Sequence, residues 1–355
     1  MRFAIAIPTD AASWRLVRRA EELGFARAWF YDTQMLSADP FVAMAAAALK
    51  TSTIRLGTGV LIPSNRLAPV AANAFASLNK LAPGRIDFGV GTGFTGRRAM
   101  GLDAIRLKDL EAYVRLVMAL FAGETVETEI EGKRRLIRLL NPELGLVNTD
   151  DPIGLYVAAT GPRARGLTAR LGADWISTIG ETVAAARALR EMRIGREAAG
   201  HGGAFDSVLL TGGVILAAGE PADSPRAVAQ AGPRAAMLLH RAADAALSGW
   251  PALAAIPPAL AGIVAGYVEA ARRFTPQGAG YLENHRGHLM FVKPVERPFI
   301  TAELIRETTF TATEPELRER VAALFAAGYS EIAFQIVPGQ EHAIEDWGRL
   351  RRAFA

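Results

Sequence analysis

Short apolar runs that alternate with helical patterns constrain the fold of this chain more than any other feature. Eight runs have the nearly continuous apolar character of buried strands, at residues 3–8, 26–31, 54–62, 85–90, 155–159, 174–179, 208–216 and 331–337. The stretches between them place apolar residues at helical spacing, as Leu16, Ala20 and Leu23 do within 12–24. Eight such strands separated by helices predict a closed parallel (β/α)8 TIM barrel rather than an open doubly wound sheet.

The remaining segments fit one decorated barrel. Further helices are predicted at residues 40–50, 69–81, 103–122, 162–171, 181–199, 225–248, 258–274, 314–327 and 342–354. No low-complexity tract or internal repeat interrupts this alternation, so residues 1–355 are expected to form a single domain.

Two insertions are expected in this domain. The first is a β-hairpin over 126–139, with its turn at Glu131-Gly132-Lys133. The second is a rim insertion over 249–312, between the seventh and eighth strands. Two long helices follow the seventh strand, one running away from the catalytic face and one returning to it. The segment 275–298 is therefore expected to form a solvent-facing loop at the catalytic mouth.

Composition excludes several classes of function. The chain has no cysteine, which excludes disulfides, thiolate nucleophiles, cysteine-ligated zinc and iron–sulfur clusters. A net charge of +4 with scattered arginines does not form a nucleic-acid footprint. No apolar stretch reaches the roughly 18 residues that span a bilayer, and the apolar N-terminal run is too short for a signal peptide. We expect a cytoplasmic protein with a small-molecule partner and no membrane or nucleic-acid partner.

A glycine-rich sequence follows the fourth predicted strand. Residues 91–96 match the dinucleotide-binding pattern GxGxxG, yet three βα units precede them and no acidic strand end follows about 20 residues later. The position favours a barrel-mouth loop in which Gly91 and Thr92 line a cofactor, and a simple turn remains the alternative.

Two further glycine positions suggest ligand contacts. Thr160-Gly161-Pro162 follows the fifth strand and opens a helix, where free N–H groups and the helix dipole can bind a phosphate, although a plain strand-to-helix turn has the same pattern. Gly57 and Gly59 interrupt the third strand, which indicates a bulge or the close approach of a flat ligand.

Three residues are candidates for chemistry. His285 and His288 lie in the predicted mouth segment and are expected either to contact substrate or cofactor or to pack within the loop. A metal site is disfavoured, because there is no HExxH pattern and Gly287 argues against a regular helix that would pair the two histidines. Asp32 sits at the expected top of the second strand, where barrel enzymes keep catalytic groups; a helix cap or a loop hydrogen-bond acceptor is the alternative.

Several motifs in order resemble the bacterial luciferase-like superfamily: residues 21–25 leading to Asp32, 54–60, 83–85, 89–93, and 158–162 with 172–174 behind them. The similarity covers most of the chain and is loosest across 217–298. It implies a (β/α)8 barrel that binds FMN or the deazaflavin coenzyme F420 at its mouth, for monooxygenation or hydride transfer on a small organic substrate. Gly161-Pro162 is more similar to the methylenetetrahydromethanopterin reductase branch. The resemblance also places a non-proline cis peptide at Gly59–Val60, against the middle ring of the cofactor.

The chain departs from one branch of this superfamily. The sugar-phosphate dehydrogenases have a histidine and a glutamate where this sequence has Thr33 and Phe94, so that substrate is not expected. The alternatives are a non-catalytic flavin-binding barrel and a cofactor-free lyase or isomerase acting on a phosphorylated metabolite. A Schiff-base aldolase is disfavoured because no lysine lies at a predicted strand end.

The resulting site has catalytic and cofactor-binding residues and no metal. Asp32, His285 and His288 are the expected catalytic residues. The expected cofactor contacts are Asp32, Gly59, Val60, Gly91, Thr92, Thr160, Gly161 and Pro162. We also expect the chain to assemble as a homo-oligomer such as a dimer.

Overall fold

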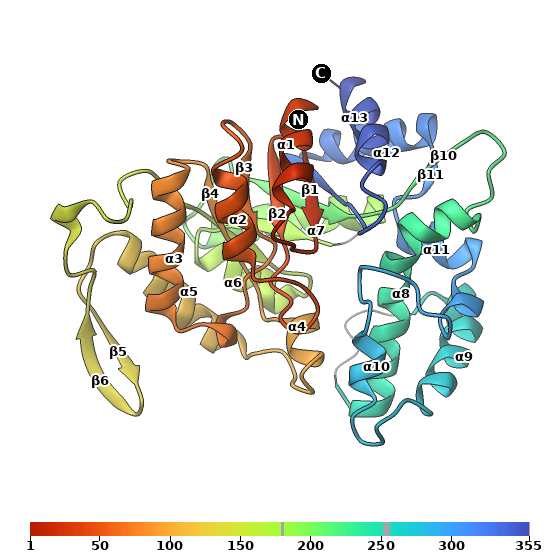
Figure 1. The fold of residues 1–355 in the computed structure, drawn as a ribbon, viewed down its shortest axis with the longest axis horizontal. Helices are drawn as coiled ribbons and strands as arrows, with labels where there is room; N and C mark the ends of the chain where they lie inside the picture. Colours follow the sequence, from red (N-terminus) through yellow and green to blue (C-terminus); the bar gives the residue numbers. More distant parts are fainter. Residues whose placement is uncertain (179–180, 251–255, 355) are drawn as a thin grey trace.

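The computed structural model describes residues 1–178, 181–250 and 256–354, and its centre is a closed barrel of eight parallel strands (Figure 1). The strand order around the barrel is β1-β12-β9-β8-β7-β4-β3-β2. These strands are β1 (Arg2–Ile7), β2 (Arg27–Phe30), β3 (Arg55–Thr58), β4 (Ile86–Val90), β7 (Gly154–Ala158), β8 (Asp174–Ser177), β9 (Ser207–Thr211) and β12 (Glu331–Gln335). The predicted TIM barrel and its eight strands are confirmed.

Helices surround the barrel and follow the predicted order. They are α1 (Trp14–Glu22), α2 (Pro40–Ala48), α3 (Ala68–Leu81), α5 (Leu107–Phe121), α6 (Pro162–Arg170), α7 (Thr182–Ala198), α12 (Glu314–Ala327) and α13 (Ala343–Arg352). Each lies within a few residues of its predicted range. Within the described parts of the chain, no helix is both long enough and apolar enough to cross a membrane.

The seventh predicted strand is shorter than expected. Its barrel part, β9, ends at Thr211, and residues beyond it form β10 (Ile215–Leu216), which pairs with β11 (Ala312–Thr313) outside the barrel. β9 ends early because the backbone N–H of Phe310 donates to the carbonyl of Gly212 at 2.8 Å. A Cβ on Gly213 would lie 2.3 Å from the Phe310 carbonyl oxygen, so only glycine allows this close backbone contact.

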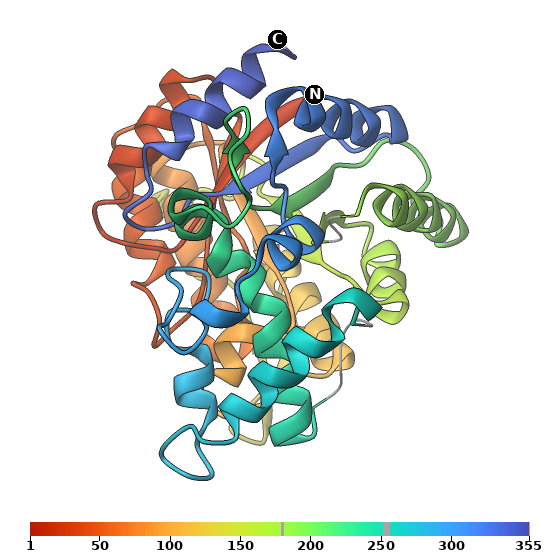
Figure 2. The same cartoon turned by 90° about the vertical axis from the view of Figure 1, so that its right-hand side faces the viewer.

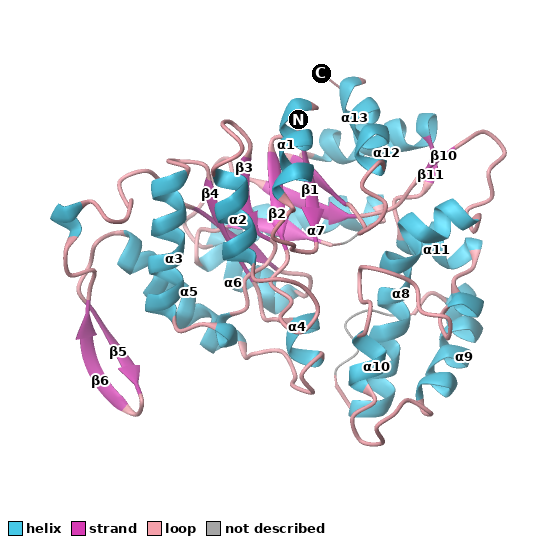
Figure 3. Ribbon diagram, in the orientation of Figure 1, coloured by secondary structure: helices cyan, strands magenta, loops and turns pink. Residues whose placement is uncertain are grey.

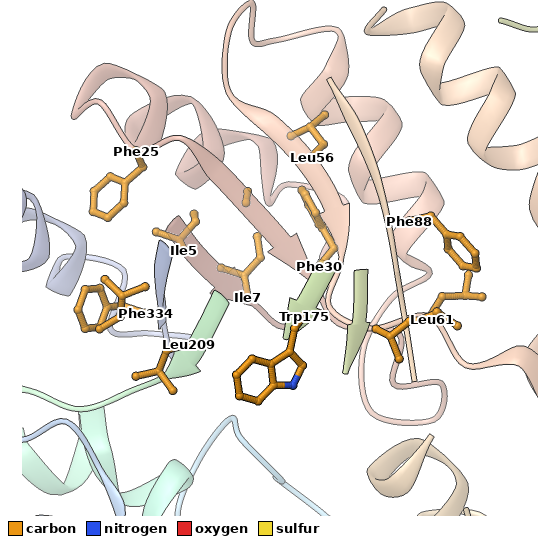
Figure 4. Close-up of a cluster of buried hydrophobic side chains, with 14 of the residues drawn as sticks. Ile5, Ile7, Phe25, Phe30, Leu56, Leu61, Phe88, Trp175, Leu209 and Phe334 are labelled. Atoms are coloured by element: carbon orange, nitrogen blue, oxygen red, sulfur yellow. The ribbon is translucent and has the colours of Figure 1, made fainter. Parts of the chain in front are cut away.

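Two cores meet at the barrel wall. In β1, Phe3, Ile5 and Ile7 face outward to the helices, whereas Ala4 and Ala6 face the interior. Figure 4 shows the outward core, in which Ile5, Ile7 and other strand side chains gather beneath the helices. The interior cluster consists of Ala4, Ala6, Trp29, Tyr31, Tyr156, Ile176, Val208, Leu210 and Ala333.

A buried ion network closes the amino end of the barrel interior. Arg27 donates to Asp87 at 2.8 Å, to Glu331 at 2.6 Å and to the hydroxyl of Tyr156 at 2.8 Å. Burial opposes the charge of Arg27, but Glu331 and Asp87 outweigh it and raise the pKa of Arg27 above its usual value. With this end filled by ions and aromatic rings, ligand access is left to the carboxyl end of the strands, called the mouth below.

The predicted hairpin projects away from the barrel (Figure 3). Its strands, β5 (Val126–Ile130) and β6 (Lys133–Ile137), pair antiparallel around Glu131 and Gly132, both of which have positive φ.

A separate helical layer lies beside the barrel (Figure 2). It contains α8 (Pro225–Ser248), α9 (Ala261–Ala271) and α11 (Ala302–Thr308), which share an apolar core that includes Leu239, Tyr267 and Leu304. Because α8 packs in this core, the layer begins earlier in the chain than the predicted insertion at 249–312. Two short helices that the sequence patterns do not predict, α4 (Phe94–Arg98) and α10 (Tyr281–His285), connect the layer to the mouth.

The ion network leads to a first prediction. Replacing Arg27 by Met leaves the buried carboxylate of Glu331 without its main partner, so we expect the free energy of unfolding to fall by about 3–5 kcal/mol. The matched control is Arg134→Met in the hairpin, where the exposed pair with Glu127 at 3.2 Å should contribute less than about 1 kcal/mol. Denaturant unfolding measures both values, and equal losses in the two variants would contradict the central place of Arg27.

Candidate active site

The parallel barrel brings the expected cofactor-binding residues to one end. Gly59 and Val60 follow β3, Gly91 and Thr92 follow β4, and the turn at 160–162 follows β7. Neighbouring loops are in contact: a Cβ on Gly91 would lie 2.7 Å from Val60 Cγ2 and 3.5 Å from Ala158 Cβ. The absent side chain of Gly91 therefore lets Val60 lie against the ends of β4 and β7, and these three residues form one surface at the mouth.

The bulge expected from the glycines of the third strand is present, and these glycines lie against Trp29. The Gly59–Val60 peptide bond is cis, as the superfamily resemblance implies. A Cβ on Gly57 would lie 2.6 Å from the ring of Trp29, and one on Gly59 would lie 2.8 Å from Trp29 Cβ. The two glycines thus make room for Trp29 inside the barrel. The residue that faces the mouth from this bulge is the partly buried Val60.

Asp32 is buried and fully engaged. Its carboxylate accepts hydrogen bonds from the Ile62 N–H at 2.9 Å and from Arg66 at 3.0 and 3.1 Å. Asn65 approaches the same carboxylate at 3.3 Å. These contacts fix the loop that follows the β3 bulge, which matches the alternative of a loop hydrogen-bond acceptor.

The fourth-strand glycines lead into a short helix. Gly91 N–H donates to the carbonyl of Leu61 at 3.1 Å, and the Thr92 carbonyl accepts from Ile105 N–H at 3.0 Å. Gly93 has φ of 76° and precedes α4. The GxGxxG pattern is therefore a turn that ends β4 and positions α4 at the mouth, as the barrel interpretation requires.

The start of α6 is open. Gly161 is its N-cap residue, no side chain caps the helix, and Pro162 occupies the first turn. Thr160, Gly161 and Pro162 are all exposed, and a Cβ on Gly161 would meet nothing within 4 Å. The nearby Arg165 is already paired with Glu191 at 2.5 Å. The free N–H groups at this helix end can donate hydrogen bonds to an anionic group.

The expectation of a solvent-facing loop at 281–288 is wrong. His285 is 1% exposed and His288 is 2% exposed, because the segment packs between α8 and α4. Its position at the mouth is confirmed, since His288 Nε2 lies 3.2 Å from Thr95 Oγ1 and Gln335, at the end of β12, donates to the Leu289 carbonyl at 2.6 Å. Alanine at either histidine is therefore expected to lower stability.

A hydrogen-bonded chain runs from the mouth into the helical layer. His288 Nδ1 lies 2.7 Å from His240 Nδ1, and His240 Nε2 lies 2.5 Å from Glu296 Oε1. Lys293 is 2.9 Å from the same carboxylate. His285 belongs to a neighbouring group, in which its Nε2 lies 3.1 Å from Asp244.

Burial decides the protonation of this chain. It lowers the pKa of His240, and it lowers the pKa of His288 well below the ordinary value. Burial alone would raise the pKa of Glu296, but the hydrogen bond from His240 and the positive charges nearby lower it. With neutral histidines and an ionised Glu296, one assignment satisfies every contact: Thr95 donates to His288, His288 to His240, and His240 to Glu296. The chain can therefore accept a proton at Thr95 Oγ1 and pass protons inward.

The sequence interpretation missed several polar groups at the mouth. The hydroxyl of Tyr31 and the Oε1 atom of Gln335 are buried without a hydrogen-bond partner among the described residues. Burial raises the pKa of Tyr31 above its usual value, so its hydroxyl stays protonated and can donate to a ligand. Both residues stand at the carboxyl ends of strands, which is the signal that could have identified them. No group of three or more His, Asp or Glu side chains in the described ranges is arranged to hold a metal ion.

Comparison with known proteins gives a consistent result. The family model described as luciferase-like monooxygenase matches residues 11–331. A curated relative, the F420-dependent glucose-6-phosphate dehydrogenase of Beutenbergia cavernae, is 41% identical over 145 residues, which cover 39% of this chain and 41% of that protein. The chain thus matches less than half the length of that relative.

Two solved structures share the fold over nearly the whole chain. An F420-dependent secondary alcohol dehydrogenase in complex with an F420-acetone adduct has a TM-score of 0.70 at 16% identity, covering 100% of this chain and 99% of that one. The oxygenating constituent of 3,6-diketocamphane monooxygenase from Pseudomonas putida, in complex with FMN, has a TM-score of 0.65 at 14% identity, covering 98% and 95%.

The buried histidines lead to a prediction about pH. The pKa values of His240 and His288 lie below the value of about 6.5 that histidine has in an unfolded chain. The unfolded state therefore binds more protons once the pH falls below that value, and stability is lost as the pH decreases further. We expect the thermal midpoint to fall between pH 7 and pH 5, and to fall less in His288→Gln than in the wild type.

The control is the exposed His201, whose replacement by Gln should leave the pH dependence of the thermal midpoint unchanged. Parallel pH profiles for the wild type and His288→Gln would show that His288 is not held neutral by burial.

Proposed function

Because the chain belongs to the luciferase-like monooxygenase family, we propose that it is an oxidoreductase that binds coenzyme F420 or FMN at the mouth of its barrel. The observation that carries this proposal is the pairing, at one barrel end, of a small-residue surface around Val60 and Gly91 with the open N-terminus of α6. The flat ring of such a cofactor needs the surface around Val60 and Gly91, and its phosphate-bearing tail needs the N-terminus of α6.

The residues present fit such a cofactor. Among the described residues, nothing would lie within 4 Å of a Cβ on Gly161, so a phosphate can approach the helix N–H groups. The buried oxygens of Tyr31 and Gln335 have no hydrogen-bond partner in the described parts of the chain and are available to polar atoms of a ring or a substrate. The bound cofactor would supply the hydride-transfer or oxygenation chemistry, and the chain would supply position and proton movement.

Coenzyme F420 with hydride transfer is the first candidate. The curated relatives at 32–41% identity include F420-dependent dehydrogenases, among them a hydroxymycolic acid dehydrogenase of Mycobacterium tuberculosis. The direction of the hydrogen-bonded chain supports the same class, since an alcohol whose carbinol carbon gives up a hydride must also lose its hydroxyl proton. Thr95 Oγ1 would take that proton while passing its own to His288 Nε2.

FMN-dependent monooxygenation is the second candidate. It is favoured by the FMN complex of a structural neighbour with the same barrel. The two candidates share the cofactor surface and differ in whether oxygen or a hydroxyl substrate approaches Tyr31.

The predicted catalytic residues take different parts in this proposal. His288 moves a proton through Thr95, and Asp32 positions the loop after the β3 bulge. His285, which contacts Asp244 and not the mouth, positions the segment that carries His288.

The proposal predicts the effect of filling the space at Gly161. We expect Gly161→Leu to weaken cofactor binding at least tenfold at an unchanged thermal midpoint, because the side chain blocks the helix N-terminus while its Cβ lies more than 4 Å from any described atom outside the neighbouring residues. Titration of the purified protein with coenzyme F420 and, separately, with FMN, followed by absorbance, measures the affinity.

The matched control is Gly202→Leu, since Gly202 also has open space and lies away from the mouth. Equal affinity in Gly161→Leu would remove the α6 N-terminus from the site. A wild-type protein that binds neither cofactor would overturn the proposed function.

A further inference from the structure

We propose that a pocket beside the mouth binds the anionic group, a carboxylate or a phosphate, of the substrate, and that Arg234 and Arg241 hold it. The inference rests on the proposed oxidoreductase function and adds the chemical class of the substrate. Two guanidinium groups on α8, those of the buried Arg234 and the half-buried Arg241, form no ion pair with the residues that the structure describes.

The pocket has a volume of about 110 Å³ and lies where α8 and α11 meet the end of β8. Four lining residues belong to α8, and they lie on one face of the helix because three of them follow Arg234 by three, four and seven positions. Arg234 and Arg241 stand two helical turns apart on this face, so both guanidinium groups serve the same pocket. The lining residues are Thr178, Arg234, Met237, Leu238, Arg241 and Thr308.

Neither arginine has an acidic partner among the described residues. Arg234 is 6% exposed and makes a single hydrogen bond, from Nη2 to the Leu210 carbonyl at 2.8 Å. The Nε atom of Arg241 is buried without any hydrogen-bond partner, and its guanidinium lies 5.3 Å from the ring centre of Phe94. A guanidinium has five N–H donors, so most of the donors of both residues are free for a ligand.

Two buried carboxylates of the helical layer already have cationic partners. Asp244 pairs with Arg98 at 3.1 Å and contacts His285. Glu296 pairs with Lys293 at 2.9 Å and contacts His240. Arg234 and Arg241 therefore form no ion pair with these two carboxylates, although the charge of Asp244 still raises the pKa of Arg241.

A guanidinium is not deprotonated in proteins, so both arginines carry their charge although burial lowers the pKa of each. Burial and the neighbouring Arg234 lower the pKa of Arg241 to about 10, which still leaves it protonated at neutral pH. Buried unpaired charges destabilise a protein unless a counter-charge arrives, so a pair of them beside an active site indicates an anionic ligand. Two arginines suit carboxylate and phosphate because each can donate two parallel hydrogen bonds.

The pocket is placed to present a substrate to the mouth. Thr178 Oγ1 lies 3.5 Å from Thr160 Oγ1, beside the start of α6. The charge of Arg234 is close enough to lower the pKa of Tyr31, although burial raises it more. An anion held by the arginines thus directs the rest of the molecule toward Tyr31 and the surface at Val60. The open α6 N-terminus remains free for the cofactor, which is why we assign the pocket to the substrate.

The first arm of the test measures anion binding by the full chain with inorganic phosphate and with succinate as probes. We expect both to raise the thermal midpoint of the wild type and to bind about ten- to a hundredfold more weakly to Arg241→Gln and Arg234→Gln. Arg187→Gln, which removes an exposed arginine on α7, should bind like the wild type. Without anion, Arg241→Gln should be at least as stable as the wild type, because it removes a positive charge that partial burial disfavours.

Several outcomes of this arm would overturn the proposal. They are a wild type that binds neither probe, arginine variants that bind as tightly as the wild type, and a ligand-free Arg241→Gln that is clearly less stable. Loss of phosphate binding in Gly161→Leu but not in Arg241→Gln would place the anion at α6 and also overturn it.

The second arm tests whether the pocket binds the substrate or the cofactor. The same variants are titrated with coenzyme F420 and FMN, and unchanged affinities would support a substrate pocket. A tenfold loss of cofactor affinity in Arg241→Gln would overturn the assignment to the substrate and give the pocket to the cofactor. A wild type that binds neither cofactor, but loses phosphate binding on Arg241→Gln, would overturn the proposed function and support the anion pocket.

Discussion

The packing of one indole ring determines much of this barrel. Trp29 fills the interior, donates from Nε1 to Glu331 at 3.0 Å and meets the ring of Tyr156 edge-on at 5.1 Å. Neighbouring strands must then present small residues, which explains Gly57 and Gly59. The interior is closed below Trp29 by the Arg27 ion network, and any ligand chemistry is left to the mouth.

Most of the fold could be predicted from sequence because its signals are local. Strand and helix periodicities, proline at helix starts and glycine at turns act over a few residues. The errors arose where tertiary contacts override the pattern. β9 ends early because the backbone N–H of Phe310 donates to the carbonyl of Gly212. The helices α4 and α10 are only five residues long, which is too short to establish a helical periodicity in the sequence.

The site was predicted less completely because its contacts join distant parts of the chain. The turns at strand ends were found, since a parallel barrel gathers them by topology. The burial of His288 was missed, because its partners Thr95 and His240 lie 193 and 48 residues away. The sequence also could not show that Arg234 and Arg241 lack ion pairs among the described residues, because this depends on the pairing of Arg98 with Asp244 and of Lys293 with Glu296.

A crystal structure of the protein grown with coenzyme F420 tests the central claim most directly. The account predicts the deazaflavin ring against Val60 and Gly91, with its phosphate at the N–H groups of α6 and Tyr31 within hydrogen-bonding reach of the ring or of the space above it. Cofactor bound away from the strand ends would contradict it.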